Sequence, residues 1–362
     1  MKEKIVHLVN TFVHLPAAGL DISDRSIKYV QYDSHKAMPI EAFGEISLPE
    51  GIIAGGVIVK EEELEHILKK WLKEEGKRMR ASFFSVSLPE EKSFLRLIQL
   101  PKVKREEIHN AIRWEIEANI PLRQEDIIYD YEIIEPLKNH LNHFDIVLTA
   151  FPKALVEAYV RVLKNAGIRL RALELESQAV ARASLPVLRE PHAKVLIEIG
   201  YSRASFIVFA GGAIFFTTTV ELGGKAFEEN IAKSMRVSMA KAQELKKQVG
   251  LNKKEYNGEV FAALAPSIAV LADETRRSIE YYRAHTTHIH GAAEEATEVL
   301  LAGGDANLYG LDTYLAGALK IPVRRVNPFA VAGMGKWCGI PPLSKRKSLA
   351  FVASIGLALR GM

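Results

Sequence analysis

The sequence has little cysteine, little excess charge and no long hydrophobic run. Its 362 residues include one cysteine, Cys338, so no disulfide bond can form within the chain, which suits a reducing cytoplasm. The 48 lysines and arginines nearly balance 44 aspartates and glutamates, and a net charge of +4 is too small to predict binding to nucleic acid. No apolar run reaches the roughly 20 residues that span a bilayer. The absence of a Gly-x-x-x-x-Gly-Lys-Ser/Thr phosphate loop excludes a P-loop enzyme, and the length allows two globular domains.

The first 16 residues carry apolar side chains at helical spacing, interrupted by His7, Asn10 and His14. We predict a helix over residues 1–16, and we do not expect a signal peptide, because the apolar stretch is broken. Such a helix either packs on the body of the protein, which is the commoner role, or lies on a membrane surface.

One short pattern occurs twice and points to a binding site for an anion. A strand ends in Gly19-Leu20-Asp21-Ile22-Ser23-Asp24, and another ends in Leu196-Ile197-Glu198-Ile199-Gly200-Tyr201-Ser202; a second strand follows each of them. Both patterns are typical of hairpins whose turns direct backbone N–H groups and hydroxyls at an anion, with a strand carboxylate able to hold a metal ion. A third strand ends in Gly303-Gly304-Asp305, where a flat base or sugar can approach the backbone.

The order of predicted strands and helices indicates an α/β protein with two related halves. The first half, residues 17–190, contains a compact α/β insertion at residues 89–165. The second half, residues 191–362, carries a helical subdomain at residues 225–297. Because both halves open on the same strand-turn-strand unit, we infer an internal duplication.

A series of segments in the chain carries a resemblance to a known family. In order, they are GLDIS-DRSIK, LIEIGYSRASFIVF, LGGKAFEENIA, ETRRSIEYY, LLAGGDANLYGLDTYL, NPF and SIGLALR, with RLIQLPKVKREEIHNAIRWEIEANIPL and DIVLTAFPKALVEAYVRVLKNAGI in the insertion. Over about residues 17–360 the chain resembles the PilM family, the actin-like proteins of type IV pilus assembly that are related to FtsA. The resemblance implies a two-domain actin-like fold, which is a ribonuclease-H-like duplicated fold, with the insertion as the family's extra small α/β subdomain.

The resemblance also implies that a cleft between the two halves binds ATP and Mg²⁺. In the first loop Asp21 would hold Mg²⁺ through water, and an acid within an apolar strand is costly without a partner. The alternative is a hairpin with a buried acid at its turn. The residues that would lie beside the phosphates are Ser23, Arg25, Ser26 and Lys28.

The second loop departs from the family at its acid. Family members usually carry Asp where this chain has Glu198, so the second carboxylate at the metal is displaced by one methylene, which predicts at most a slow ATPase. Gly200 and Ser202 would still contact phosphate. Glu176 resembles the superfamily glutamate that approaches the metal-bound water, and its alternative role is a favourable charge at a helix N-terminus. The resemblance therefore gives catalytic roles to Asp21, Glu176 and Glu198.

On the base side, Gly223-Gly224-Lys225 would place a helix N-terminus near the ribose or phosphates. Glu274 and Arg277 match the adenosine-side helix of actin-like ATPases, although their spacing is also typical of a surface ion pair. The turn Gly303-Gly304 would lie against the adenine. Asp305 stands where the family commonly has a small residue, so its side chain narrows the space beside the base, faces the ribose or caps the following helix.

The resemblance implies a cytoplasmic scaffold at the inner face of the cell membrane. The chain would hold the N-terminal tail of the membrane protein PilN in a groove between the first domain and the insertion, with ATP stabilising or switching this clamp. It would reach the membrane through this partner and contact other inner-membrane proteins of pilus assembly; self-association stays open. The alternatives are a small-molecule kinase, a type II secretion protein and an FtsA-like membrane-associated protein. The kinase is disfavoured because no acidic base for a substrate hydroxyl is evident.

Overall fold

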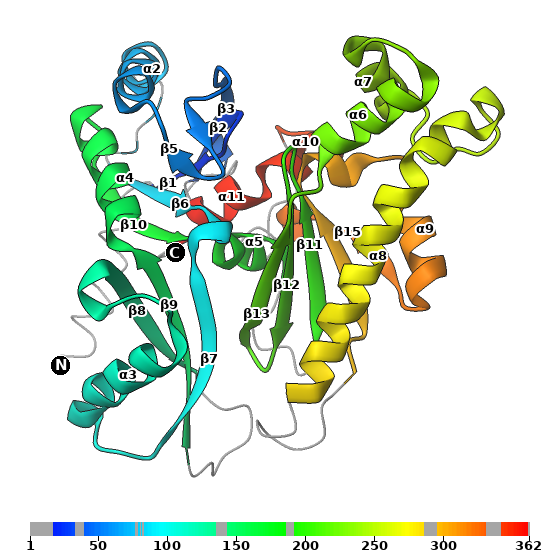
Figure 1. Ribbon diagram of the computed structural model, residues 1–362. Coiled ribbons are helices and arrows are strands. Elements are labelled where there is room, and N and C mark those ends of the chain that lie inside the picture. Colours follow the sequence, from blue (N-terminus) through cyan, green and yellow to red (C-terminus); the bar gives the residue numbers. More distant parts are fainter. Residues whose placement is uncertain are drawn as a thin grey trace.

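Two α/β halves stand side by side in the structure and meet near its centre (Figure 1). The computed structural model describes residues 17–32, 40–76, 79, 81, 83–134, 143–185, 192–285, 295–330 and 342–360. The helix predicted over residues 1–16 and Cys338 lie outside the described residues. Among the described helices, none combines the length and the apolar character needed to cross a bilayer.

The first half is built on a five-stranded sheet of order β10-β6-β1-β2-β3. Strands β1, β2 and β3 form an antiparallel meander, whereas β6 and β10 run parallel to β1. The strands are β1 (Ala17–Ile22), β2 (Ser26–Tyr32), β3 (Ile40–Ser47), β6 (Phe83–Leu88) and β10 (Leu170–Leu175).

The second half repeats this topology in a sheet of order β13-β12-β11-β14-β15. Here β11, β12 and β13 form the antiparallel meander, and β14 and β15 run parallel to β11. The shared order confirms the inferred duplication. The strands are β11 (Lys194–Ile199), β12 (Ala204–Ala210), β13 (Ala213–Val220), β14 (Glu298–Ala302) and β15 (Val323–Arg325).

Two helices join the halves by close backbone contact. Helix α11 (Val352–Ala358) packs on β1 and on α5 (Glu176–Ser184). Gly356 lies against the carbonyl of Ala179, and Gly19 lies against the carbonyl of Ser354, so neither glycine has room for a Cβ atom. Small residues are therefore required where the C-terminal helix crosses the first sheet.

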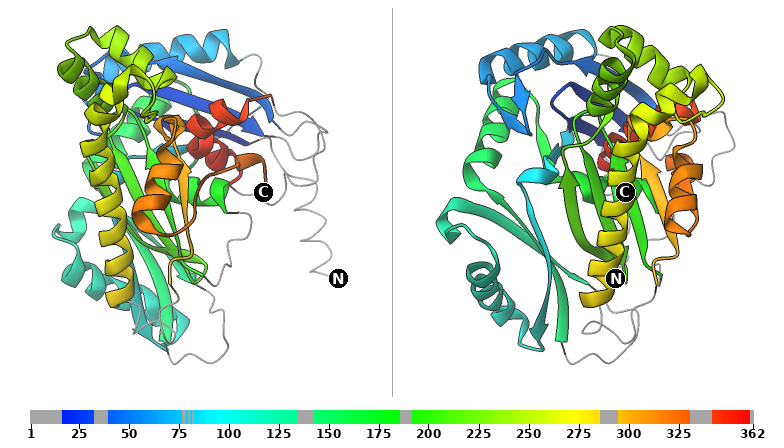
Figure 2. Two further views of the ribbon diagram at one scale, coloured as in Figure 1. Left: turned by 90° about the vertical axis from the view of Figure 1, so that its right-hand side faces the viewer. Right: turned by 45° about the vertical axis from the view of Figure 1, so that its right-hand side comes forward.

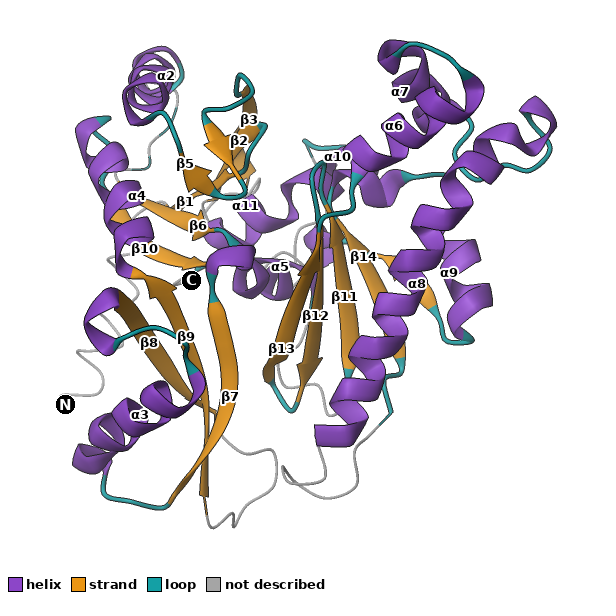
Figure 3. Cartoon of the chain, viewed as in Figure 1, coloured by secondary structure: helices purple, strands orange, loops and turns teal. Residues whose placement is uncertain are grey.

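The remaining helices cover the sheets from outside (Figures 2 and 3). Helix α8 runs along the second sheet, α6 packs on α8 and α7 packs on α6, while α2 and α4 pack together on the first half. The helices and short elements are α2 (Glu61–Glu74), α4 (Lys153–Asn165), α6 (Gly224–Met235), α7 (Met239–Gln248), α8 (Glu259–His285), α9 (Leu311–Leu319), α10 (Lys345–Ser348), the hairpin β4 (Ile53–Ala54) and β5 (Val57–Ile58), and the 3-10 turns η2 (Glu90–Lys92), η6 (Gly304–Asn307) and η8 (Leu349–Phe351).

The insertion has a three-stranded sheet of its own, of order β7-β9-β8, covered by one helix. Its buried side chains form a cluster separate from the main core, centred on Ile112, Ile116 and Ile146. The buried residues of α4, among them Tyr159 and Val162, belong to the main core instead. The bounds 89–165 for the insertion thus stay a prediction. The elements are β7 (Phe94–Pro101), α3 (Arg105–Asn119), β8 (Ile127–Ile134) and β9 (His143–Pro152).

Candidate functional site

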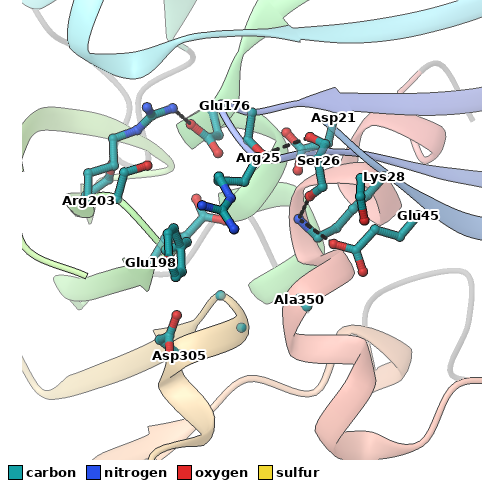
Figure 4. A pocket seen from close by; sticks show the side chains of 18 of the residues that line it. Asp21, Arg25, Ser26, Lys28, Glu45, Glu176, Glu198, Arg203, Asp305 and Ala350 are labelled. Atoms are coloured by element: carbon teal, nitrogen blue, oxygen red, sulfur yellow. Dashed lines mark hydrogen bonds and ion pairs between the residues drawn. The ribbon is translucent and has the colours of Figure 1, made fainter. Parts of the chain in front are cut away.

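A pocket of about 350 Å³ opens between the two halves, where the turns of both meanders point at one another (Figure 4). It brings together twelve of the residues singled out in the sequence. These are Asp21, Ser23, Arg25, Ser26, Lys28, Glu176, Glu198, Gly200, Ser202, Gly303, Gly304 and Asp305.

The two acids of the repeated pattern occupy equivalent positions. Asp21 is the next-to-last residue of β1 and pairs with Lys28 across the hairpin, and Glu198 is the next-to-last residue of β11 and pairs with Ser205. The equal register directs both carboxylates to one pocket from opposite sides, because side chains alternate strictly along a strand.

The first hairpin is held in place by hydroxyl groups. Ser87 of β6 donates its Oγ hydrogen to Asp21 Oδ1 at 2.9 Å and accepts the Ile22 N–H at 3.1 Å. Beside it, Lys28 Nζ donates to Ser26 Oγ at 3.0 Å. Asp21 is 5 % exposed, so its carboxylate is fixed by a neighbouring strand and cannot turn to bulk water.

The second hairpin carries an arginine that the motif did not single out. Arg203 donates through Nη1 to Glu91 Oε1 at 2.6 Å, and its Nη2 lies 3.4 Å from Glu176 Oε2. Both carboxylates belong to the first half, so Arg203 links the halves across the pocket (Figure 4). A second contact across the pocket places the Arg25 guanidinium over the Tyr201 ring, 4.6 Å from its centre.

Two carboxyl groups of the pocket, those of Glu176 and Glu198, have a raised pKa and so hold their protons more tightly than exposed acids do. Burial raises the pKa of Glu176 to about 7, and the charges of Asp21 and Glu91 add to the effect, although Arg203 lowers it. Burial, together with Glu176 and Asp21, also raises the pKa of Glu198 well above its ordinary value. The pocket therefore crowds buried carboxyl groups together, and a bound cation would favour their ionised form.

The residues fit a magnesium ion held together with a phosphate ligand. Carboxylate and hydroxyl oxygens are the donors that Mg²⁺ prefers, and the mutual repulsion of Glu176 and Glu198 favours a cation between the hairpins. In the described part of the chain, no three acids, histidines or cysteines are grouped closely enough to chelate an ion by themselves.

Buried Glu176 should make the nucleotide-free protein less stable as the pH rises. Its pKa of about 7 exceeds the ordinary 4.5, so its contribution to folding is fully present below about pH 4.5 and is lost as the pH rises through about 7. Between about pH 5 and about pH 8 we expect the unfolding free energy of the wild type to fall by roughly 1 to 3 kcal/mol more than that of Glu176→Gln. Urea denaturation measures this difference, and equal pH dependence in the two proteins would contradict the account.

The wall of the pocket at the turn after β14 is built around a buried ion pair. Asp305 Oδ1 accepts a hydrogen bond from Lys246 Nζ at 2.6 Å, and Lys246 also lies 2.8 Å from Glu228 Oε1. The Asp305 carboxylate fills the space in which a Cβ atom on Gly224 would lie. Burial raises the pKa of Asp305, while Lys246 acts in the opposite direction. Asp305 thus binds α6 and α7 to the turn after β14, and the capping position of the turn η6 is occupied by Gly303 and not by Asp305.

Five predicted residues do not line the pocket. The N–H groups of Gly224 and Lys225 donate to the carbonyls of Gly200 and Tyr201, at 3.0 and 2.8 Å. This helix N-terminus therefore supports the second hairpin from behind, with Gly223 packed on the same carbonyls. Glu274 and Arg277 lie on α8 as an ion pair at 3.4 Å, with the Arg277 side chain 74 % exposed. The residues outside the lining are Gly223, Gly224, Lys225, Glu274 and Arg277.

The pocket also contains residues that sequence reasoning missed. Ser205 occupies the position across from Glu198 that Lys28 occupies across from Asp21, so comparing the two hairpins would have found it. Gln243 comes from α7, and no local pattern marks it. The missed residues that line the pocket are Glu45, Ser47, Tyr201, Arg203, Ser205, Gln243 and Ala350.

Two halves of like topology around a pocket with an acid-bearing hairpin on each side define an actin-like protein. Residues 19–362 match the family described as type IV pilus assembly protein PilM. The match covers nearly the whole chain, so the protein belongs to the PilM family and its role lies in type IV pilus assembly. The resemblance seen in the sequence is thereby confirmed.

Solved structures and curated relatives agree with this membership. The fold matches a PilM–PilN type IV pilus biogenesis complex with a TM-score of 0.78 and 25 % identity, over 95 % of this chain and 98 % of that chain. It matches ADP-bound MreB5 of Spiroplasma citri with a TM-score of 0.56 and 14 % identity, over 89 % and 95 % of the two chains, which shows the fold alone. FtsA of Bacillus subtilis is 23 % identical over 193 residues, 49 % of this chain and 43 % of FtsA, so the chain spans less than half of that relative. Mbl of Bacillus cereus is 22 % identical over 241 residues, 56 % of this chain and 72 % of Mbl.

Proposed function

We propose that the protein is an ATP-binding scaffold of type IV pilus assembly that binds the cytoplasmic tail of a PilN protein. The observation that carries the nucleotide half is the pocket between the two hairpins, where Ser23, Arg25, Lys28 and Ser202 stand around the buried carboxylates. Cationic and hydroxyl donors suit phosphates, and the acids suit the Mg²⁺ that accompanies them. The nucleotide-bound MreB5 structure, which shares this fold, is consistent with a nucleotide in the cleft.

The proposed scaffold turns ATP over slowly at most. Glu198 carries one methylene more than the aspartate usual in the family, and its pKa is raised well above the ordinary value. Arg203 lies 3.4 Å from the carboxylate of Glu176, the acid proposed to act near the attacking water. Both features favour binding over rapid hydrolysis.

The partner half of the proposal rests on apolar side chains around α4. Four large apolar residues are exposed on α4 or on the elements that adjoin it, β5 and its following residue and β8 (Figure 1). We call these residues, Val57, Val59, Ile128 and Val160, the α4 surface, because they lie on α4 or on elements that contact it. A short extended peptide with apolar side chains suits exposed apolar residues of this kind. The complex that matches this chain contains PilN, which supports the identity of the partner.

Through this tail the scaffold would sit at the inner face of the cell membrane, beside the other inner-membrane proteins of pilus assembly. Such a location needs no membrane-spanning segment in the chain itself. Binding of the tail would therefore explain both the partner and the location of the protein, so tail binding is the property to test first.

A charge on the α4 surface should weaken tail binding. We expect Val160→Asp to weaken binding of a fluorescein-labelled peptide, with the sequence of the cytoplasmic N-terminal segment of the same organism's PilN, by about tenfold or more. Val160 is 36 % exposed on α4, and the matched control Val270→Asp changes a valine that is 48 % exposed on α8 of the other half. Fluorescence anisotropy gives both affinities.

If Val160→Asp and Val270→Asp bound the peptide equally tightly, the tail would bind elsewhere on the protein. Absence of binding to the wild type would remove the partner half of the proposal. If ATP were consumed only in the presence of a small alcohol or acid, the result would instead favour the alternative function, a small-molecule kinase.

A further inference from the structure

We propose that Arg25 and Tyr201 form a clasp across the pocket that makes it prefer a nucleoside triphosphate to a diphosphate. In this clasp Arg25 contacts the phosphates, and Tyr201 is the positioning residue that holds the guanidinium in place. The proposal rests on the proposed function, because it names what distinguishes one nucleotide from another at the site assigned there. It starts from the charges of the pocket lining, since a phosphate chain brings negative charge among carboxyl groups.

Three basic side chains line the pocket, and two of them already have carboxylate partners. Lys28 lies 3.8 Å from Glu45, and Arg203 is held by the two carboxylates of the first half described above. Within the described part of the chain, the Arg25 guanidinium has no acidic partner and instead contacts the Tyr201 ring, 4.6 Å from its centre. Arg25 is therefore the cation of the lining whose charge is available to a ligand.

The contact with Tyr201 fixes the guanidinium without using its hydrogen-bond donors. Arg25 extends from the first hairpin toward the side of the pocket that carries Glu198 (Figure 4). An arginine above an aromatic ring is attracted by the electron-rich face of the ring, so its N–H groups stay available. These groups lie in one plane and match two oxygens of a phosphate. An arginine that is already positioned also loses less freedom when it binds a ligand.

The backbone is anchored on both sides of the clasp. In the first hairpin the Arg25 carbonyl accepts a hydrogen bond from the Leu48 N–H at 2.8 Å. In the second hairpin the Tyr201 carbonyl accepts one from the Lys225 N–H, also at 2.8 Å. The start of α6 does not line the pocket, but it contributes to the site by holding the turn that carries Tyr201.

The clasp favours a ligand with a long phosphate chain. With the nucleoside at the Gly303-Gly304 turn, as the family resemblance implies, the chain extends toward the turns of the two hairpins. The outermost phosphate of ATP lies at Arg25, and ADP lacks this phosphate. Because a hydrogen bond between charged groups changes affinity by about tenfold or more, the pocket should prefer ATP to ADP by about that factor.

The test measures the Kd values of ATP and of ADP, each with Mg²⁺, by isothermal titration. We expect the wild type to bind ATP about tenfold or more tightly than ADP. Arg25→Gln and Tyr201→Leu should reduce this ratio to about threefold or less, because the first removes the charge and the second removes the aromatic face. Tyr201→Phe retains the aromatic face, so its ratio should stay within about twofold of the wild-type ratio.

A matched control completes the experiment. Tyr309→Leu changes a tyrosine that is 60 % exposed elsewhere on the second half, and it should keep the wild-type ratio. The Arg25 side chain is exposed, so Arg25→Gln serves if Tyr201→Leu does not fold.

The clasp is overturned, and the proposed function left standing, by equal Kd values in a wild type that binds both nucleotides or by a wild-type ratio in Arg25→Gln or Tyr201→Leu. It is also overturned if the ratio of Tyr201→Phe is as low as that of Tyr201→Leu. A wild type that binds no nucleotide overturns the proposed function and the clasp with it.

Discussion

Changing Asp21 to asparagine is expected to weaken binding of ATP with Mg²⁺ by about 10- to 100-fold. The carboxylate is buried and held by the Ser87 hydroxyl at 2.9 Å, so the charge that a cation would meet has a fixed position. Loss of a charged partner costs about 1.5 to 3 kcal/mol, and each 1.4 kcal/mol is tenfold in affinity. Titration with a fluorescent ATP analogue, with Mg²⁺ or with EDTA, measures the loss.

The control is a second buried strand aspartate remote from the pocket. Asp145 of β9 is 4 % exposed, close to the 5 % of Asp21, but it belongs to the insertion. Asp145→Asn should keep the wild-type affinity. If EDTA removes the difference between Asp21→Asn and the wild type, the carboxylate acts through the cation. If Asp21→Asn bound ATP with the wild-type affinity and the wild-type dependence on Mg²⁺, the role assigned to Asp21 would be contradicted.

Substitution by alanine should have different effects at the two positions of the Gly303-Gly304 turn. Gly303 has a φ of +88°, and a Cβ atom there would meet the backbone of Ile199 at the end of β11. Gly303→Ala should therefore lower the unfolding free energy by about 3 kcal/mol or more, because it adds backbone strain to a collision with an immobile strand. Chemical denaturation of the two proteins measures this loss.

Gly304→Ala supplies the matched variant. Its Cβ atom would meet only the Ala350 side chain, at an ordinary 3.6 Å, so its stability should stay within about 1 kcal/mol of the wild type. Gly304 lines the pocket, and an added methyl group should weaken ATP binding there. Equal destabilisation by the two substitutions would show that the turn does not have the described backbone.

The duplicated meanders were predictable because their signal is local. Asp21 and Glu198 each end a short apolar strand before a turn, and the equal register of the two hairpins follows from that pattern. Strands β8, β13 and β14 carry the same kind of local signal, a short apolar or alternating stretch. The buried side chains of α4 likewise recur at helical spacing within the helix itself.

The interactions that decide the site were not predictable, because they join distant segments. Arg203 pairs with Glu91, which is 112 positions away in the sequence, and Lys246 pairs with Asp305, which is 59 positions away. No local residue pattern predicts such a pair, because the two residues come together only in the folded protein. The small elements β15 and α9 were also missed, since three strand residues and a nine-residue helix with little polar contrast give weak periodicity.

Glycine was the signal most open to misinterpretation. The pair Gly223-Gly224 suggested a helix N-terminus aimed at a ligand, but its space is taken by hairpin carbonyls and by Asp305. Gly303 suggested contact with a base, whereas its φ and the nearby Ile199 backbone give it a structural reason as well. A glycine-rich turn therefore indicates close approach of something, and only the fold shows whether that is a ligand or the chain itself.

The central claim is that one ATP binds in the cleft between the two hairpins together with Mg²⁺. Isothermal titration of the wild-type chain with ATP in the presence of Mg²⁺ tests it most directly. The account predicts one molecule bound per chain, with an affinity that falls by about tenfold or more when EDTA replaces the metal. Absence of saturable binding, or an affinity that EDTA leaves unchanged, would contradict it.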